Sequence, residues 1–323
     1  MSLSASLGAT RFRPDLLSLD DLDEAQLHAL LTLAHQLKRG ERVANLHGKV
    51  LGLVFLKAST RTRVSFTVAM YQLGGQVIDL SPSNTQVGRG EPVRDTARVL
   101  GRYVDGLAIR TFAQTELEEY AHYAGIPVIN ALTDHEHPCQ VVADLLTIRE
   151  NFGRLAGLKL AYVGDGNNVA HSLLLGCAKV GMSIAVATPE GFTPDPAVSA
   201  RASEIAGRTG AEVQILRDPF EAARGAHILY TDVWTSMGQE AETQHRLQLF
   251  EQYQINAALL NCAAAEAIVL HCLPAHRGEE ITDEVMEGPR SRIWDEAENR
   301  LHAQKAVLAA LMGGREGHHH HHH

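Results

Sequence analysis

The feature that most constrains the fold is the alternation of short apolar runs with segments of helical spacing along the whole chain. The run Val50–Phe55 is followed by Val64–Leu73, and the same pairing recurs from Lys159–Val163 to the end of the sequence. Strands that alternate with helices predict parallel sheets covered by helices. We therefore predict an α/β protein with two doubly wound parallel-sheet domains and the active site in the cleft between them.

The length of 323 residues is enough for two domains of ordinary size. The first strand–helix series spans residues 1–150 and the second spans 151–294, with Asn151–Gly157 as the candidate hinge. A closing helix is expected at about Asp295–Leu311. Residues 318–323 are six consecutive histidines, which we interpret as a purification tag.

The composition is that of a soluble globular protein, with 45% hydrophobic and 21% charged residues. A net charge of −9 argues against nucleic-acid binding, and no apolar run is long enough to cross a membrane. Without an export signal we expect a cytoplasmic protein. No cysteine belongs to a CxxC pair and no cluster has metal-ligand spacing, so we expect free thiols, no metal and no cofactor.

Apolar periodicity places the individual elements. We expect strands at Val50–Phe55, Gln76–Leu80, Gly106–Ile109, Val128–Asn130, Lys159–Val163, Ile184–Ala187, Val213–Leu216, His227–Tyr230 and Ala267–Leu270. We expect helices at Leu19–Leu37 behind Ser18 and Asp20, and at Val64–Leu73, Val93–Tyr103, Leu117–Tyr123, Pro138–Asn151, Ala197–Arg208 and Gln244–Tyr253, with another ending at Val180.

Polar segments follow the predicted strands at six places. In open parallel sheets ligands bind beyond the carboxyl ends of the strands. Six such segments at the same edge of two sheets predict a ligand-binding cleft between the domains. These segments are 59–63, Arg110, 134–140, 164–168, 232–238 and 271–274.

The segment Ser59–Arg63, Ser-Thr-Arg-Thr-Arg, joins a buried strand to a helix. The first turn of a helix has free N–H groups and a dipole that favours negative charge. Hydroxyl groups and two guanidinium groups in that turn suit a phosphate. An ordinary helix cap with surface arginines is the alternative.

Three further side chains can donate hydrogen bonds to negative oxygens. Arg110 ends a strand, and His137 and Gln140 lie at the start of the helix that begins at Pro138. The alternative for His137 is a histidine bonded to backbone near a helix cap.

Gly164-Asp165-Gly166 after a strand partly matches a dinucleotide-binding fingerprint. The third glycine position is Val169, so we interpret Asn167 and Asn168 as turn residues with one amide facing the cleft. If the partial fingerprint does bind a dinucleotide, the alternative function is that of a nicotinamide-dependent dehydrogenase.

The segment Asp232–Gly238, Asp-Val-Trp-Thr-Ser-Met-Gly, has an acid that could meet an ammonium group. A surface turn formed by Asp232 is the alternative. Cys272 is either a site residue or an inert core thiol, because a nucleophilic cysteine requires a lowered pKa and a base.

These motifs together resemble the ornithine branch of the aspartate/ornithine carbamoyltransferase family, over essentially the whole untagged chain. Ser-Thr-Arg-Thr-Arg at 59–63 and His-Pro-Cys-Gln at 137–140 are similar to the family's carbamoyl-phosphate motifs. Asp232–Gly238 and His-Cys-Leu-Pro at 271–274 are similar to the segments of the ornithine branch. The segments at 81–91, 165–168 and 295–300 also fit.

The resemblance implies transfer of a carbamoyl group from carbamoyl phosphate to L-ornithine, giving L-citrulline and phosphate, in arginine biosynthesis. It implies a carbamoyl-phosphate domain at 1–150, an ornithine domain at 151–294, a final helix at 295–312 that packs on the first domain, and a homotrimer. It also implies roles for individual residues. Carbamoyl phosphate is assigned to Ser59, Thr60, Arg61, Thr62, Gln86, Arg110, His137, Gln140, Cys272, Leu273 and Arg300; ornithine to Asn168, Asp232, Ser236 and Met237; catalysis to Arg110, His137, Cys272 and Asp232.

The chemistry expected from this resemblance is direct attack by the neutral side-chain amine, without a covalent intermediate. Thr60, Arg110 and His137 would stabilise the developing oxyanion, and Arg61 would stabilise the leaving phosphate. Cys272 would then position and desolvate the amine. Aspartate, putrescine or N-acetylornithine as the amine substrate, and a non-catalytic binder of phosphate metabolites, are the remaining alternatives.

Overall fold

Two parallel sheets confirm the predicted α/β architecture. This computed structural model describes residues 12–80, 90–235 and 242–313. It divides into two units, one with the residues up to Val142 and those from Arg300 onward, the other with Ala143–Asn299. Each unit contains one of the sheets. The functional domain limits expected at 150 and 294 stay predictions.

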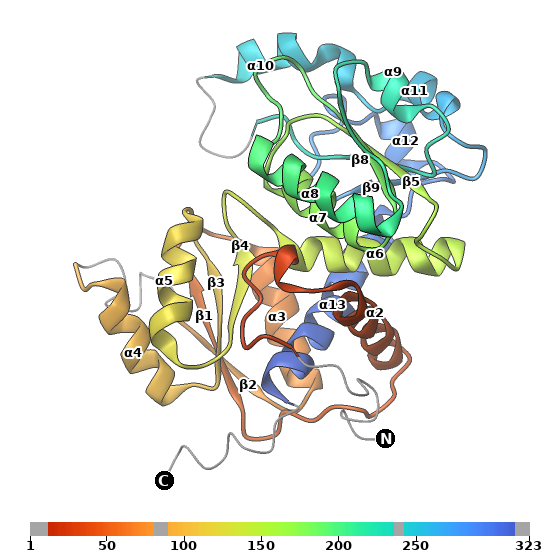
Figure 1. Cartoon of the computed structure of the whole chain (residues 1–323). Helices are drawn as coiled ribbons and strands as arrows, with labels where there is room; N and C mark the ends of the chain where they lie inside the picture. Colours follow the sequence, from red (N-terminus) through yellow and green to blue (C-terminus); the bar gives the residue numbers. More distant parts are fainter. Residues whose placement is uncertain (1–11, 81–89, 236–241, 314–323) are drawn as a thin grey trace. The chain divides into compact units, whose positions relative to one another are not determined.

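The first sheet has the strand order β2-β1-β3-β4. Its strands are β1 (Val50–Phe55), β2 (Gln76–Asp79), β3 (Gly106–Arg110) and β4 (Val128–Leu132). The helices α4 (Val93–Tyr103) and α5 (Gln114–Ala124) lie together on one face, and α3 (Thr60–Gln72) covers the other (Figure 1). Because β1 and β3 are covered on both faces, they consist almost entirely of buried apolar residues.

The second sheet has the order β7-β6-β5-β8-β9. Helix α7 (Asn168–Lys179) packs beside α8 (Pro196–Thr209), and α9 (Pro219–Ala223) packs beside α11 (Ala257–Cys262) on the opposite face (Figure 1). The sheet is therefore enclosed by helices, as the apolar strand sequences predict. Its strands are β5 (Lys159–Val163), β6 (Ser183–Ala187), β7 (Val213–Leu216), β8 (Ile228–Thr231) and β9 (Ile268–His271).

The chain passes from the first unit to the second within α6 (Pro138–Phe152) and returns within α13 (Ile293–Met312). The remaining described elements are η1 (Leu19–Asp21), α2 (Glu24–Lys38), α10 (Thr243–Phe250), η4 (Glu251–Tyr253) and α12 (Asp283–Glu287).

The predicted starts of three helices are wrong, and for α5 the helix begins at Gln114 rather than Leu117. The first long helix begins at Glu24 rather than Leu19, because Asp23 forms a capping box with Gln26 and Ser18 caps only the short η1. Helix α3 begins at Thr60 rather than Val64, so the Ser-Thr-Arg-Thr-Arg motif forms its first turn. The short helices α9, α11 and α12 were not predicted, since five or six residues show little apolar periodicity.

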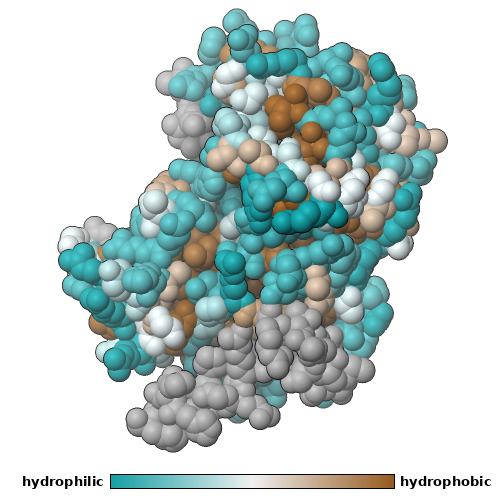
Figure 2. All heavy atoms as spheres, in the orientation of Figure 1, coloured by the Kyte–Doolittle hydropathy of each residue, from teal (hydrophilic) through white to brown (hydrophobic). Residues whose placement is uncertain are grey.

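The surface of the described residues is largely hydrophilic in the view of Figure 2, with hydrophobic residues gathered in small separate patches. Among these residues no helix has both the length and the apolar character that crossing a bilayer requires.

Candidate functional site

The first group of predicted site residues surrounds the start of α3. Ser59 precedes the helix, and its hydroxyl makes no capping hydrogen bond among the described residues. Thr60 and Arg61 are exposed, whereas Thr62 is buried. The unpaired N–H groups of this turn and the exposed Arg61 guanidinium together suit a bound phosphate.

Strand register places Arg110 beside this turn. Arg110 pairs with Phe55, the last residue of β1, and the carbonyl of Arg110 accepts a hydrogen bond from Leu56 N at 2.8 Å. On its other side the β3–β4 register shifts between Ile109 and Arg110. Such irregularities re-aim side chains at the ends of sheets. Removal from water lowers the pKa of Arg110 to about 10, so its guanidinium remains charged at neutral pH.

Thr133 fixes the turn that leads to His137. Its hydroxyl accepts hydrogen bonds from the backbone N–H groups of His135 at 3.2 Å and Glu136 at 3.1 Å, and donates to Gln114 at 2.8 Å. The turn is also tied to the start of η1, because Leu19 N donates to the Glu136 carboxylate at 3.0 Å. His137 therefore enters α6 from a rigid turn.

His137 is buried, with 6% of its surface exposed. Burial, followed by the charges of Arg300 and Arg110, holds the pKa of His137 well below its ordinary value of 6.5. The imidazole is therefore neutral at physiological pH. A neutral imidazole still has one N–H donor for a carbonyl oxygen, and its stabilising effect increases as negative charge develops there.

Arg300 of α13 connects three helices of the first unit. Its Nη1 donates to Gln140 Oε1 at 2.9 Å, its Nη2 to Thr62 Oγ1 at 3.1 Å and its Nε to Gln304 Oε1 at 3.1 Å. The guanidinium thereby holds two predicted ligand-binding residues in place. This bonding favours a supporting part for Arg300, although its predicted contact with the carbamoyl group stays a prediction.

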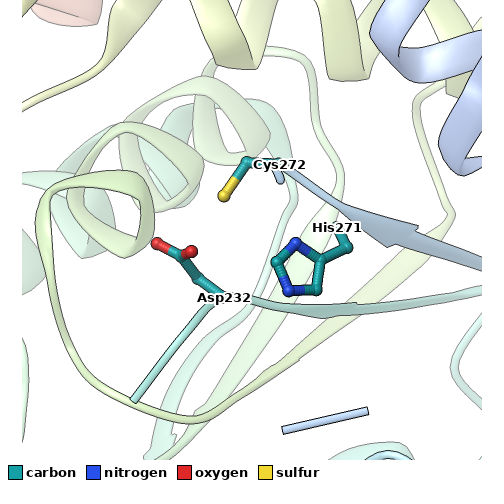
Figure 3. A group of neighbouring side chains, drawn as sticks. All are labelled: Asp232, His271 and Cys272. Atoms are coloured by element: carbon teal, nitrogen blue, oxygen red, sulfur yellow. The ribbon is translucent and has the colours of Figure 1, made fainter. Parts of the chain in front are cut away.

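The second group of predicted site residues follows β8 and β9. The strands are paired with Thr231 opposite His271, so Asp232 and Cys272 are the next residues of two neighbouring strands. The thiol of Cys272 points toward the carboxylate of Asp232 (Figure 3). Removal from water, the charge of Asp232 and a hydrogen bond to it raise the pKa of the Cys272 thiol well above 9.0. A protonated thiol is a poor nucleophile, which supports a positioning role.

Asn167 orients the Asp232 carboxylate. Its Oδ1 accepts from Ala170 N at 3.2 Å and caps α7, which leaves its Nδ2 to donate to Asp232 Oδ2 at 2.7 Å. The other carboxylate oxygen accepts from Val233 N at 2.7 Å. Asn167 was predicted as a turn residue, while the site role was assigned to Asn168, whose Oδ1 accepts from Val169 N at 2.8 Å.

His271 holds the backbone on which Cys272 lies. Its Nδ1 accepts from Leu273 N at 2.8 Å, so its Nε2 carries the proton that bonds Glu280 Oε2, also at 2.8 Å. Leu273 has a positive φ of 64°, an uncommon conformation for a residue with a side chain. The bond to His271 restrains that conformation.

Asp232, His271 and Cys272 have potential metal-ligand atoms within 4.8 Å of one another. Both ring nitrogens of His271 already make hydrogen bonds, and the thiol is protonated. Metal binding would have to break these bonds and remove that proton, so the trio does not resemble a preformed metal centre.

A buried pair of acids lies behind these residues. Asp144 of α6 accepts a hydrogen bond from Tyr230 Oη at 2.8 Å, and Glu296 of α13 accepts one from His271 N at 2.9 Å. Burial, then the charge of Asp144 and a hydrogen bond to it, raise the pKa of Glu296 well above 4.5. The pair therefore shares a proton and joins α6 and α13 to the strands that carry Asp232 and Cys272.

Because of this acid pair, we expect the free energy of unfolding to depend on pH, and Glu296→Gln should reduce that dependence. Because the pKa of Glu296 is raised in the native state, its protonation stabilises the folded protein fully below the unfolded pKa of 4.5. This stabilisation is lost as the pH rises toward the native pKa. Glutamine can accept from His271 N and donate to Asp144 without titrating. Urea unfolding between about pH 5 and pH 8 should show a smaller loss of stability in this variant than in the wild type. Parallel curves would contradict the shared proton, and Glu296→Ala should be destabilised throughout.

Known families and structures match this chain over nearly its whole length. The carbamoyl-phosphate-binding domain of aspartate/ornithine carbamoyltransferases matches residues 14–150, and the Asp/Orn-binding domain of the same enzymes matches residues 156–311. The chain belongs to the aspartate/ornithine carbamoyltransferase family. The predicted resemblance and the assignment as a carbamoyltransferase are thereby confirmed.

Individual members of the aspartate/ornithine carbamoyltransferase family are close in sequence and fold. The ornithine carbamoyltransferase of Nostoc punctiforme is 64% identical over 299 residues, which cover 93% of this chain and 97% of that protein. The crystal structure of ornithine carbamoyltransferase from Gloeobacter violaceus matches with 94% identity and a TM-score of 0.88, covering 94% of this chain and 100% of that one. The enzyme from Pyrococcus furiosus matches with 48% identity and a TM-score of 0.90, covering 94% and 98%.

The structure brings most predicted site residues into two groups that suit this family. The first contains Ser59 to Thr62 with Arg110, His137, Gln140 and Arg300, and the second contains Asn168, Asp232, Cys272 and Leu273. Gln86, Ser236 and Met237 lie outside the described residues. Sequence reasoning missed the supporting residues Thr133, Asp144, Glu280 and Glu296. It named Asn167 and His271 only as members of the segments 164–168 and 271–274, without their supporting bonds. A helix-cap signal could have identified Asn167.

Proposed function

We propose that this chain transfers the carbamoyl group of carbamoyl phosphate to the side-chain amine of L-ornithine, forming L-citrulline and phosphate in arginine biosynthesis. The observation that carries the proposal is the Asp232–Cys272 pair at adjacent strand ends. Its carboxylate suits the ammonium group of an amino acid. The named relatives, ornithine carbamoyltransferases at 60–65% identity, support the same substrate.

The proposed reaction is a direct displacement. The neutral amine nitrogen bonds to the carbonyl carbon, the bond from that carbon to the phosphate oxygen breaks, and the nitrogen releases a proton as phosphate leaves. Arg110 and the neutral His137 would donate to the carbonyl oxygen as charge develops on it. Arg61, the hydroxyl groups of the first turn of α3 and its free N–H groups would hold the phosphate.

Ornithine would be held by the second unit. Asp232 and Asn168 would bind its amino-acid end, together with Ser236 and Met237, and Gln86 of the first part of the chain would join the phosphate ligands. Cys272 and Leu273 would lie beside the attacking amine. A partly buried, cationic environment disfavours the ammonium form of that amine, which must lose a proton before it attacks.

The oligomeric state, the cofactor requirement and the cellular location that we propose follow from the resemblance to the carbamoyltransferase family and from the sequence. The protein would form a homotrimer or a multiple of trimers, would need no metal or organic cofactor, and would work in the cytoplasm. Its four cysteines are free thiols, which suits a reducing compartment.

An amine panel tests the substrate. Purified protein with carbamoyl phosphate is expected to carbamoylate ornithine faster than aspartate, putrescine or N-acetylornithine, as measured by product formation for each amine. Putrescine lacks the carboxylate of ornithine, and aspartate would require additional basic groups in the second domain in place of the acid Asp232. Faster reaction with any of these three amines would overturn the assignment to ornithine.

A further inference from the structure

Three loops of the second sheet and one helix are tied together around a single guanidinium. The loops follow β5, β6 and β8, and the helix is α10, which contains Arg246. The loop after β8 contains Asp232, which the proposed function assigns to ornithine. The loop after β5 contains Asn167, whose side chain donates a hydrogen bond to Asp232. All the residues involved belong to the second unit.

Gly166 allows the loops after β5 and β6 to meet backbone to backbone. Its N–H donates to Phe192 O at 2.9 Å. A Cβ at this position would lie 2.3 Å from Pro194 N and 2.5 Å from Phe192 O, so only glycine fits. This packing explains Gly166 without a dinucleotide, and it fixes the loop that contains Asp165 and Asn167.

Arg246 joins the loops after β5 and β8. Its Nη1 donates to Trp234 O at 2.8 Å and lies 3.3 Å from Asp165 Oδ2. Trp234 is two residues after Asp232, and Asp165 is two residues before Asn167. The Arg246 guanidinium therefore binds both loops, and these are the loops that contribute Asp232 and Asn167 to their mutual hydrogen bond.

Aromatic packing closes the arrangement. The Arg246 guanidinium lies over the ring of Phe192, 4.9 Å from its centroid. Phe192 meets Phe250 edge to face at 4.9 Å, and Phe250 stacks on Trp234 at 5.6 Å. Arg246 and Phe250 are four residues apart and share one face of α10. We call Asp165, Phe192, Trp234, Arg246 and Phe250 the Arg246 cluster.

Two carboxylates face the Arg246 guanidinium, that of Asp165 at 3.3 Å and that of the exposed Glu242, 3.5 Å from Nε. Burial raises the pKa of Asp165 to about 6, while the charge of Arg246 and its hydrogen bond act in the opposite direction and Asp232 adds to the rise. Protonation of Asp165 would weaken the ion pair with Arg246. The ion pair is only partly exposed, with 13% of the Arg246 side chain and 23% of the Asp165 side chain in contact with solvent.

We propose that Arg246 is a positioning residue that sets the affinity of the second unit for ornithine by holding the loops of Asp232 and Asn167 in register. The inference rests on the proposed function. Arg246 acts through the backbone of Trp234 and the carboxylate of Asp165 and does not itself touch the substrate. Loss of the guanidinium would let the two loops move apart and misalign the Asp232 carboxylate.

The test compares steady-state kinetics of Arg246→Ala and Arg246→Gln with the wild type. Removal of a charge-assisted hydrogen bond should raise the KM for ornithine about 10-fold or more in Arg246→Ala. The KM for carbamoyl phosphate should stay within about 2-fold, because the phosphate ligands belong to the other unit. Glutamine can still reach one acceptor, so Arg246→Gln should show a smaller rise.

Arg201→Ala is the matched control, because Arg201 lies on α8 of the same unit and pairs with Glu204 at 3.1 Å on the surface. Its kinetics should equal those of the wild type. Protonation of Asp165 is expected to raise the ornithine KM of the wild type below about pH 6, and Asp165→Asn should remove the part of that rise that depends on Asp165.

The outcomes separate the two proposals. If the wild type forms no citrulline, the proposed function fails. If the wild type is active and folded variants of Arg246 keep its ornithine KM, the positioning role is wrong. A lower thermal midpoint with unchanged KM, or equal rises in both KM values, would also overturn it by showing a merely structural role.

Discussion

Replacing Arg61 with alanine should lower kcat/KM for carbamoyl phosphate by about 100- to 1,000-fold, the usual loss when one donor to a developing charge is removed. Arg61 is exposed in the first turn of α3 and forms no ion pair within the described part of the chain. Its charge is therefore available to the leaving phosphate. Steady-state citrulline formation at varied carbamoyl phosphate measures the effect.

Arg63→Ala is the matched control for this variant. Arg63 lies two residues further along α3, and its Nη1 is 3.5 Å from Asp79 Oδ2, so its charge already has a partner. The change should reduce activity only a few-fold, since exposed ion pairs contribute little. Equal losses in both variants, or unchanged kinetics in Arg61→Ala, would show that the phosphate does not bind at this turn.

Replacing Asp232 with alanine should raise the KM for ornithine by about 10- to 100-fold, the range expected when a hydrogen bond between charged groups is lost. Asp232 is 8% exposed and its carboxylate is oriented by Asn167 and Val233, so the alanine variant loses a charge that is held in a fixed position. Saturation curves for each substrate separately should show the change for ornithine and a much smaller one for carbamoyl phosphate.

Two further variants show whether the effect of Asp232→Ala comes from the lost charge and whether it is specific to this position. Asp232→Asn keeps the shape but not the charge, so a comparable loss would identify charge as the essential property. Asp218→Ala removes the cap of α9, which follows β7 in the same unit, and should leave the ornithine KM unchanged despite some loss of stability. An equal loss of carbamoyl phosphate affinity in Asp232→Ala would count against its assignment to ornithine.

Local sequence patterns predicted most helices and strands because the spacing of apolar residues depends on the secondary structure of the same segment. Val50–Phe55, Lys159–Val163 and Val213–Leu216 were predicted with the bounds that the structure has. Buried strands are uniformly apolar, and a strand is short enough for its ends to be visible in the sequence. The predicted start of α2 was wrong because the Asp23 capping box decides where that helix begins. The predicted start of α3 was wrong because its first turn is polar and therefore shows no apolar periodicity.

The candidate site was predicted as a set of strand-end segments, but its supporting bonds were not. Arg300 bonds to Thr62 and Gln140, which are 238 and 160 residues away in the sequence. The bond between Asn167 and Asp232 and the buried pair of Asp144 and Glu296 also join distant segments. No local pattern marks such partners.

The sequence by itself determined the α/β class, the succession of strands and helices, and the chemical character of each strand-end segment. Apolar periodicity and the properties of single side chains are sufficient for these. The tertiary structure decided that Asp232 and Cys272 are neighbours, because β8 pairs with β9 with Thr231 opposite His271. It also decided that His137 is neutral, because burial and two nearby guanidinium groups act on its pKa only in the folded chain.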